Sequence, residues 1–125
     1  MPVYSHILYD IVPNIKQTIL LKPQVILLEG LNILQNNNIS NIIDFSIYLD
    51  APEYLIKKWY HNRLTKLYKY SNVNTSHRKI YYISNYKWHN INKYNLIYNI
   101  LPSKNKANII IIKKEHHKID KIIFK

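Results

Sequence analysis

Apolar residues fall in two patterns along the chain: short continuous runs, and longer stretches in which they recur at helical spacing. The runs have the length of β-strands and lie at residues 24–28, 45–49, 108–113 and 121–125. The first run is continuous rather than alternating, which predicts a strand buried on both faces, as in a parallel sheet. The polar stretch at 36–38 predicts a loop, and Pro13 with Asn14 predicts a turn.

Two helices are predicted between the second and third runs. Asp50 and Pro52 mark the start of the first, because Asp50 can cap a helix and Pro52 suits its first turn. The apolar side of this helix repeats at Ile56, Tyr60, Leu64 and Leu67. Residues 71–76 predict a loop. The second helix is expected over about residues 78–99, with Pro102 ending it.

This order of elements predicts an α/β fold in one domain over residues 1–125, with a partial sheet flanked by helices. The gap between the last two runs is short, which predicts an antiparallel return. Three or four strands are few for a layered α/β sheet, so at least one strand is expected to show an unpaired edge.

The composition excludes several classes of protein. The chain has no cysteine, which rules out a disulfide framework and thiolate metal sites and suits a reducing cytoplasm. No secretion signal is expected from the sequence. The longest aliphatic run, residues 109–112, is far shorter than the roughly 20 residues that cross a membrane. We therefore expect a cytoplasmic protein with no membrane partner.

The net charge of +11 raises the alternative of a nucleic-acid-binding module. Ile, Lys, Asn and Tyr make up more than half of the chain, and the only arginines are Arg63 and Arg78. These abundant residues have A/T-rich codons, and the lysines are scattered rather than gathered on one segment. Phosphate recognition favours clustered arginine forks. Compositional drift explains the charge better, so a nucleic-acid partner is considered unlikely.

Five stretches resemble the bacterial type I pantothenate kinases, which belong with the phosphoribulokinase and uridine kinase relatives of the P-loop fold. In the family's order they are PVYSHILYDIVP (2–13), VILLEGLNILQ (25–35), DFSIYLDAPEYLIKKWYHNRL (44–64), WHNIN (88–92) and NILPSKNKA (99–107). The resemblance implies the C-terminal portion of a P-loop kinase-like layered fold. It also implies ATP-dependent phosphorylation of pantothenate to 4'-phosphopantothenate, the first step of coenzyme A biosynthesis, with ATP and Mg²⁺ as co-substrate and ion.

The residues needed to hold ATP are not all present. A phosphate-binding loop of the form G-x-x-x-x-G-K-[ST] needs two glycines, and this chain has one, Gly30. By resemblance, that loop and the general-base aspartate precede the PVYSH stretch. We therefore expect residues 1–125 to be the acceptor-side part of the kinase domain, inactive alone and bound to no cofactor. A separately encoded N-terminal half is a possible partner, and the family implies a homodimer. The alternative to a split enzyme is a non-catalytic remnant that pairs with another kinase chain.

The resemblance also assigns roles to individual residues. The residues expected to contact pantothenate are Tyr60, Asn92, His6, Tyr4 and Tyr9. Arg63, three residues after Tyr60 and so on the same helical face, is the expected contact to the transferred phosphate. On the nucleotide side, the resemblance points to His117 near adenine and Glu29 near the phosphates or metal. No metal site is expected, because His6 lacks a partner at ligand spacing and His116 and His117 would face opposite ways in an extended chain. Without the resemblance, Tyr60 would be a half-buried core residue and Arg63 a solvated charge.

Overall fold

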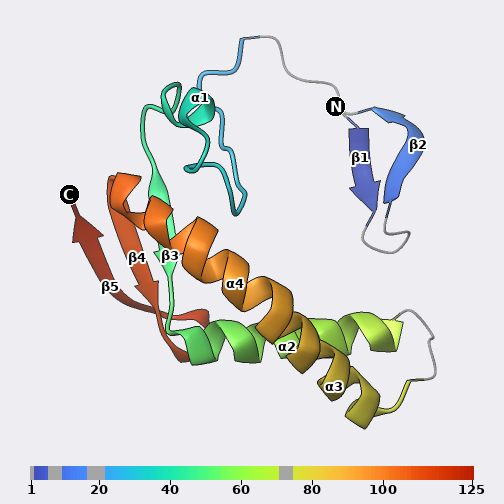
Figure 1. Ribbon diagram of the computed structural model, residues 1–125. Helices are drawn as coiled ribbons and strands as arrows, with labels where there is room; N and C mark the ends of the chain where they lie inside the picture. The colour runs from blue at the N-terminus through green and yellow to red at the C-terminus, as the bar shows by residue number, and fades with distance from the viewer. Residues whose placement is uncertain (1, 6–9, 17–21, 71–74) are drawn as a thin grey trace.

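The computed structural model describes residues 2–5, 10–16, 22–70 and 75–125 (Figure 1). The strands are β1 (Pro2–Ser5), β2 (Asp10–Lys16), β3 (Ile47–Asp50), β4 (Ile109–Lys113) and β5 (Ile119–Phe124). The helices are α1 (Asn37–Ser40), α2 (Glu53–Tyr70), α3 (His77–Lys87) and α4 (Lys93–Asn95). Shorter turns are π-helical in η1 (Trp88–Asn92) and η2 (Leu96–Ile100), and 3-10 in η3 (Leu101–Lys106) and η4 (Glu115–His117). The predicted α/β class, a partial sheet flanked by helices, is confirmed.

The main sheet has three strands in the order β3-β4-β5. β3 pairs with β4 in parallel, with Ile47 opposite Ile109 and Asp50 opposite Ile112. β4 pairs with β5 antiparallel, so the predicted return between the last two apolar runs is confirmed. The outer edge of β3 pairs with no strand among the residues that the structure describes. The unpaired edge expected from the small number of strands is therefore present.

The strand predicted over residues 24–28 is wrong. Residues 25–30 have no regular secondary structure, and the side chains of Val25 and Leu27 are 84% and 90% exposed. A continuous apolar run becomes a buried parallel strand only when strands and helices lie around it. The edge of β3 could have paired with this run but does not. The sequence therefore has the side chains of a buried strand without the neighbours that would bury them.

Two other local predictions are also wrong. Pro13 and Asn14 lie inside β2, which pairs with β1 in a separate two-stranded antiparallel sheet. Proline is tolerated there because each strand of a two-stranded sheet has a free edge that needs no N–H donor. Residues 36–38 are not only a loop, since Asn36 caps the short helix α1 and its side chain accepts the N–H of Asn38.

The core lies against one face of the main sheet. Tyr48 from β3, Ile110 from β4 and Ala107 are buried together, and the partly buried side chains around them are Leu34, Ile100, Ile112 and Ile123. Because residues alternate between the two faces of a strand, Tyr48 and Ile110 share this face with Ile123 of β5. Burial raises the pKa of Tyr48 above its ordinary value, and the charge of Asp50 adds to the shift.

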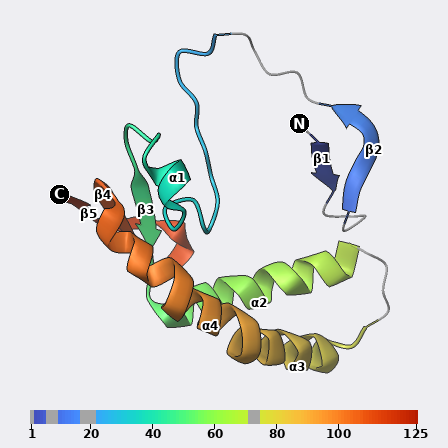
Figure 2. The ribbon, with the colours of Figure 1, turned by 45° about the horizontal axis from the view of Figure 1, so that its top comes forward.

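The helix predicted over residues 78–99 is confirmed as part of a longer helical segment, in which α3, η1, α4 and η2 follow one another from residue 77 to residue 100. Ser76 caps it by accepting the N–H of Lys79 at 3.3 Å. The segment ends at residue 100, two residues before Pro102, as predicted. Pro102 itself lies in the first turn of η3, where its missing N–H costs no hydrogen bond. Figure 2 shows α3 beside α2, with α4 leading back toward the sheet. No helix in the described part of the chain has both the length and the apolar composition to cross a membrane.

Candidate functional site

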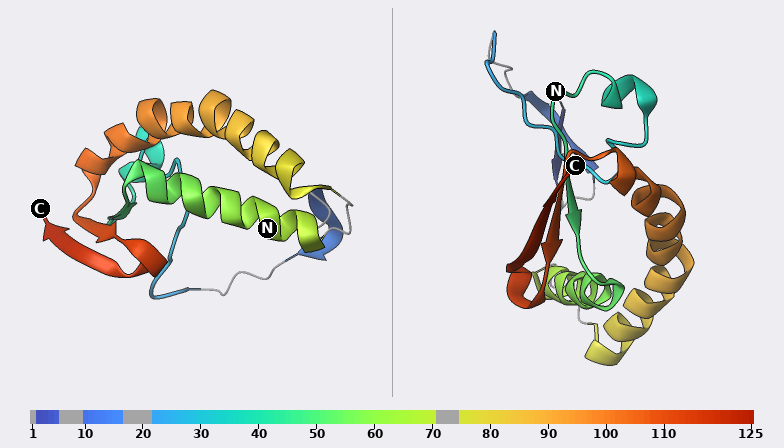
Figure 3. Two further views of the ribbon diagram at one scale, coloured as in Figure 1. Left: turned by 90° about the horizontal axis from the view of Figure 1, so that it is seen from below. Right: turned by 90° about the vertical axis from the view of Figure 1, so that its left-hand side faces the viewer.

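A cavity of about 210 Å³ opens between α2 and α3. α2 contributes Lys57, Lys58, Tyr60 and His61 to its wall, and α3 contributes Ser84 among others. The two helices pack side by side in Figure 2 and in the left view of Figure 3. The exposed surface of the wall is mainly apolar and comes from aromatic rings and aliphatic side-chain atoms, with a small contribution from polar atoms. A mostly apolar wall with a few polar groups is typical of small-molecule sites.

Tyr60 lies between this cavity and the core of the helical segment. Its ring is tilted against the ring of Trp88, with the centroids 6.1 Å apart. Trp88 is buried at the start of η1, and its Nε1 has no hydrogen-bond partner among the described residues. A buried indole N–H normally finds an acceptor, so the position next to Tyr60 has an unused donor.

A short hydrogen bond joins the two helices at the cavity wall. His61 Nδ1 lies 2.6 Å from Ser84 Oγ, and Ser84 Oγ donates to the carbonyl oxygen of Tyr81 at 2.9 Å. Because the single hydroxyl hydrogen of Ser84 is used in the second bond, His61 Nδ1 must be the donor in the first. The Nε2 atom of a neutral His61 is then left as an acceptor. The His61 ring also meets the ring of Tyr81 edge-on, with the centroids 5.2 Å apart.

The lysines of the cavity wall have partners on two other elements. Lys58 forms an ion pair with Glu115 of η4, with Nζ and Oε2 3.1 Å apart. Lys57 Nζ lies 3.3 Å from His89 Nε2 of η1. Lys58 is exposed and Lys57 is half-buried, so these contacts are expected to add little to stability.

The structure places Arg63 and Asn92 on the two elements that carry Tyr60 and Trp88. Arg63 is exposed, one helical turn after Tyr60 on α2. Asn92 is half-buried at the end of η1, four residues after Trp88. The N–H of Lys93 bonds to the carbonyl of Trp88, five residues earlier, so Asn92 lies within a widened helical turn. Such π-type turns are often found at functional sites.

His117 lies on the other side of α2. Its ring stacks on that of Trp59, with the centroids 4.1 Å apart and the planes at 27°. His116 and His117 both have φ of 58°, a left-handed conformation that is uncommon for residues other than glycine. The condition under which they would face opposite ways, an extended chain, is therefore not met, because η4 is a tight turn anchored to α2 by Trp59 and Lys58.

Among the predicted site residues that the structure describes, Tyr60 lines this cavity, whereas Arg63, Asn92, His117 and Glu29 do not. Glu29 is exposed in the irregular segment after residues 25–28, so the structure does not place it at the end of a strand, as the sequence pattern predicted. Tyr4 lies on β1, of which only the backbone is described, and His6 and Tyr9 fall outside the described residues. No three His, Asp or Glu side chains in the described ranges gather closely enough to hold a metal ion.

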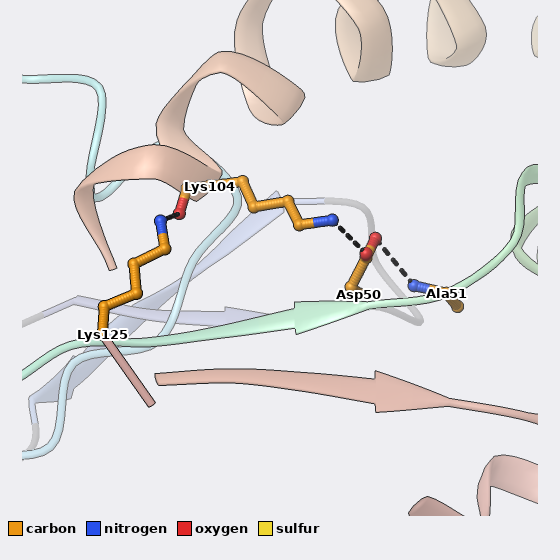
Figure 4. Close-up of polar contacts among 4 residues, drawn as sticks. All are labelled: Asp50, Ala51, Lys104 and Lys125. Carbon is orange, nitrogen blue, oxygen red and sulfur yellow. Dashed lines mark hydrogen bonds and ion pairs between the residues drawn. The ribbon is translucent and has the colours of Figure 1, made fainter. Parts of the chain in front are cut away.

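A second group of polar contacts lies along β3, with Asp50 at its carboxyl end and Lys125 toward its amino end (Figure 4). Lys104 Nζ forms an ion pair with Asp50 Oδ2, while Asp50 Oδ1 accepts the N–H of Ala51 at 3.0 Å. Asp50 therefore bonds to the chain just before α2. The sequence predicted that Asp50 would cap a helical N–H, and this prediction is wrong. Lys125 Nζ donates to the carbonyl of Lys104 at 3.0 Å, which fixes the end of the chain to η3.

Sequence reasoning missed Lys57, Lys58, His61 and Ser84. Ser84 could have been found, because it lies four residues after the apolar Ile80, within the buried stripe of α3. A hydroxyl at such a position must find a partner, either in the preceding turn or on a facing helix. The identity of that partner as His61 requires the packing of α2 against α3.

Comparisons with known proteins agree with this fold. Residues 1–120 match the phosphoribulokinase / uridine kinase family. A pantothenate kinase of Lactococcus lactis subsp. cremoris (strain SK11) is 43% identical over 140 residues, covering 100% of this chain and 45% of the relative. A pantothenate kinase of Klebsiella pneumoniae subsp. pneumoniae is 36% identical over 141 residues, covering 97% of the chain and 44% of the relative. The resemblance drawn from the sequence motifs is confirmed. The chain spans less than half the length of these curated relatives.

Proposed function

This chain belongs to the phosphoribulokinase / uridine kinase family, and from that premise we propose that it forms the pantothenate-binding side of a kinase. In this proposal the cavity between α2 and α3 is part of the acceptor site. The nucleotide-binding half lies outside these 125 residues and supplies ATP and Mg²⁺. The observation that carries the proposal is the position of Tyr60, on the cavity wall with its ring against the buried Trp88.

The chemistry of pantothenate matches the side chains of this cavity. Pantothenate has one carboxylate, one amide and two hydroxyls, so its site needs cationic and neutral donors together with acceptors. Lys57 and Lys58 offer charge to the carboxylate. Tyr60 offers a hydroxyl. Asn92 does not line the cavity and is half-buried at the end of η1, so its amide is proposed as a contact from the resemblance alone.

Arg63 is proposed to act at the boundary between the two substrates. It is exposed one turn beyond Tyr60, so its guanidinium can reach outward toward a phosphate held by another part of the enzyme. Phosphoryl transfer depends mainly on the positioning of the two substrates and on neutralisation of the phosphate charge. Arg63 would supply part of that neutralisation.

The described residues do not form a Mg²⁺ site by themselves, because no cluster of three carboxylates or histidines lies among them. Mg²⁺ usually keeps several waters and is held by one or two carboxylates together with phosphates, so a single carboxylate such as Glu29 could add to a site built by the nucleotide-binding half. The single Gly30 likewise cannot form a phosphate-binding loop. We assign the metal, the phosphate loop and the general base to the nucleotide-binding half. This chain alone is expected to show no turnover.

A chimera tests the proposal. These 125 residues would replace the matching region of the Lactococcus lactis pantothenate kinase, and ATP-dependent phosphorylation of pantothenate would be measured. We expect activity in the chimera and a loss of at least about a hundredfold in kcat/KM on Tyr60→Ala, the scale of two or more binding interactions. Tyr82→Ala, an exposed tyrosine on α3, is the matched control and should keep the activity. A folded but inactive chimera, or one indifferent to Tyr60→Ala, would rule out this role.

A further inference from the structure

One ring nitrogen of His61 is left as an acceptor at the cavity between α2 and α3. His61 Nδ1 donates to Ser84 Oγ at 2.6 Å, because the hydroxyl hydrogen of Ser84 is already used in the bond to the carbonyl of Tyr81. A neutral imidazole has a single N–H, so His61 Nε2 carries a lone pair and no hydrogen. No hydrogen bond to Nε2 occurs in the described part of the chain. The contact with Ser84 therefore fixes which nitrogen of this wall residue accepts.

The other polar side chains of the wall are less selective. The amines of Lys57 and Lys58 only donate, whereas tyrosine hydroxyls and the amide of Asn85 can both donate and accept. They can therefore adjust to either kind of ligand group, but Nε2 of the neutral His61 requires a donor. Because the wall is mainly apolar, each of its few polar atoms has a large influence on the orientation of a ligand.

The spacing along α2 identifies which donor of pantothenate reaches this nitrogen. Lys57 and His61 are four residues apart, so they share one face of the helix with roughly 5–6 Å between their Cβ atoms. In the proposed function, the charge of Lys57 attracts the carboxylate of pantothenate. The nearest donor to that carboxylate is the amide N–H, since only the β-alanine methylene groups lie between them. Both hydroxyls are farther along the molecule.

We propose that His61 Nε2 accepts the amide N–H of pantothenate and that Ser84 is the positioning residue that holds the required tautomer. His61 then determines specificity for an amide at this point of the substrate. A site built to pair with a donor binds an analogue without that donor poorly, because its own acceptor is left unpaired. The inference rests on the proposed function, because it takes this cavity as the pantothenate site.

A substrate analogue and a variant together test the bond. In the chimera with the Lactococcus lactis pantothenate kinase, phosphorylation would be measured with pantothenate and with an analogue whose amide nitrogen is replaced by an ester oxygen. His61→Asn should raise the KM for pantothenate by about fivefold, the scale of one neutral hydrogen bond. The kcat should not change, because the amide does not react and the bond is the same in the transition state. The preference for pantothenate over the ester should fall by the same factor.

Two further variants separate the bond from the structure of the wall. Asparagine keeps a donor near the position of Nδ1 and loses the acceptor, whereas glutamine has an oxygen near the position of Nε2. His61→Gln should therefore recover at least about half of the preference for the amide. His77→Asn is the matched control, because His77 is exposed at the start of α3 and does not line the cavity. Circular dichroism of each variant checks that its helices remain.

Three results would overturn the proposal: an unchanged amide preference in His61→Asn, an equal loss in His77→Asn, or a fall in kcat at unchanged KM. Nitrogen-15 NMR of the His61 ring gives a test that needs no turnover, since a proton on Nε2 in the neutral ring would also rule out the acceptor. Failure of the proposed function gives a different result. A chimera that phosphorylates neither compound contradicts that function and this inference together, whereas a chimera active on pantothenate with unchanged preference in His61→Asn contradicts this inference alone.

Discussion

The hydrogen bond between His61 and Ser84 provides a direct test of how α2 is held against α3. Ser84 is 3% exposed, and its Oγ accepts from His61 Nδ1 at 2.6 Å. Ser84→Ala removes this acceptor with almost no change in shape and leaves the His61 N–H unpaired at a half-buried position. A weaker contact here would loosen the wall that also carries Tyr60.

The magnitude follows from the burial of the two groups. A net hydrogen bond contributes about 1 kcal/mol, and a buried donor left unpaired costs about 1–3 kcal/mol. His61 is only half-buried, so water partly satisfies the exposed N–H and the lower part of that range applies. We expect Ser84→Ala to lower the free energy of unfolding by about 1–2 kcal/mol. The coupling energy in a double-mutant cycle with His61→Ala should be about 1 kcal/mol.

Ser103 supplies a matched control. It is 5% exposed, and its Oγ donates to the carbonyl of Ile100 at 2.6 Å, just as Ser84 Oγ donates to Tyr81. Ser103→Ala therefore removes the same local bond without removing a contact between helices. The difference between the two variants isolates the bond to His61.

Urea unfolding followed by tryptophan fluorescence measures these energies, because Trp88 is buried and reports the loss of packing around η1. The cycle is best run with Leu49→Lys and Phe124→Lys in the background, which reduces the apolar surface that favours aggregation. Coincident fluorescence and circular dichroism curves would justify a two-state treatment. A cost for Ser84→Ala no larger than that for Ser103→Ala, or a coupling energy near zero, would refute the reasoning.

Three further predictions concern the sheet. Ile110→Ala should lower the free energy of unfolding by about 2–4 kcal/mol, against less than about 1 kcal/mol for the exposed Ile122→Ala, as measured by urea unfolding. Burial raises the pKa of Tyr48, so its stabilising contribution is fully present below the unfolded pKa of about 10 and is lost as the pH rises through the folded value. Tyr48→Phe should therefore flatten the alkaline fall in stability, and unchanged curves would contradict this. The chain expressed alone should bind the dye ANS and aggregate, and Leu49→Lys with Phe124→Lys should reduce both; a sharp thermal transition from a soluble, unmodified monomer would disagree.

Most of the elements that the sequence predicted correctly have a pattern and neighbours that are local; β3 is the exception, because its partner β4 lies far along the chain. β4 and β5 are apolar runs joined by a short turn, so their pairing follows from proximity along the chain. α2 and the long helical segment have apolar stripes of many residues, which decide their type regardless of context. The run at 24–28 has an equally clear strand pattern but forms no strand, because a buried strand needs partners that its own residues cannot provide.

The sequence by itself determined the family, the α/β class and the inventory of groups, including the single glycine that excludes a phosphate loop within these residues. Only the tertiary structure decided which of those groups meet. The bond from His61 to Ser84 and the stack of Trp59 on His117 join residues far apart along the chain. The spacing of apolar residues in the sequence shows which face of a helix or strand is apolar. Which residues contact that face is decided by how the helices and strands pack together. For the same reason, only the structure showed that the second face of the sheet remains uncovered.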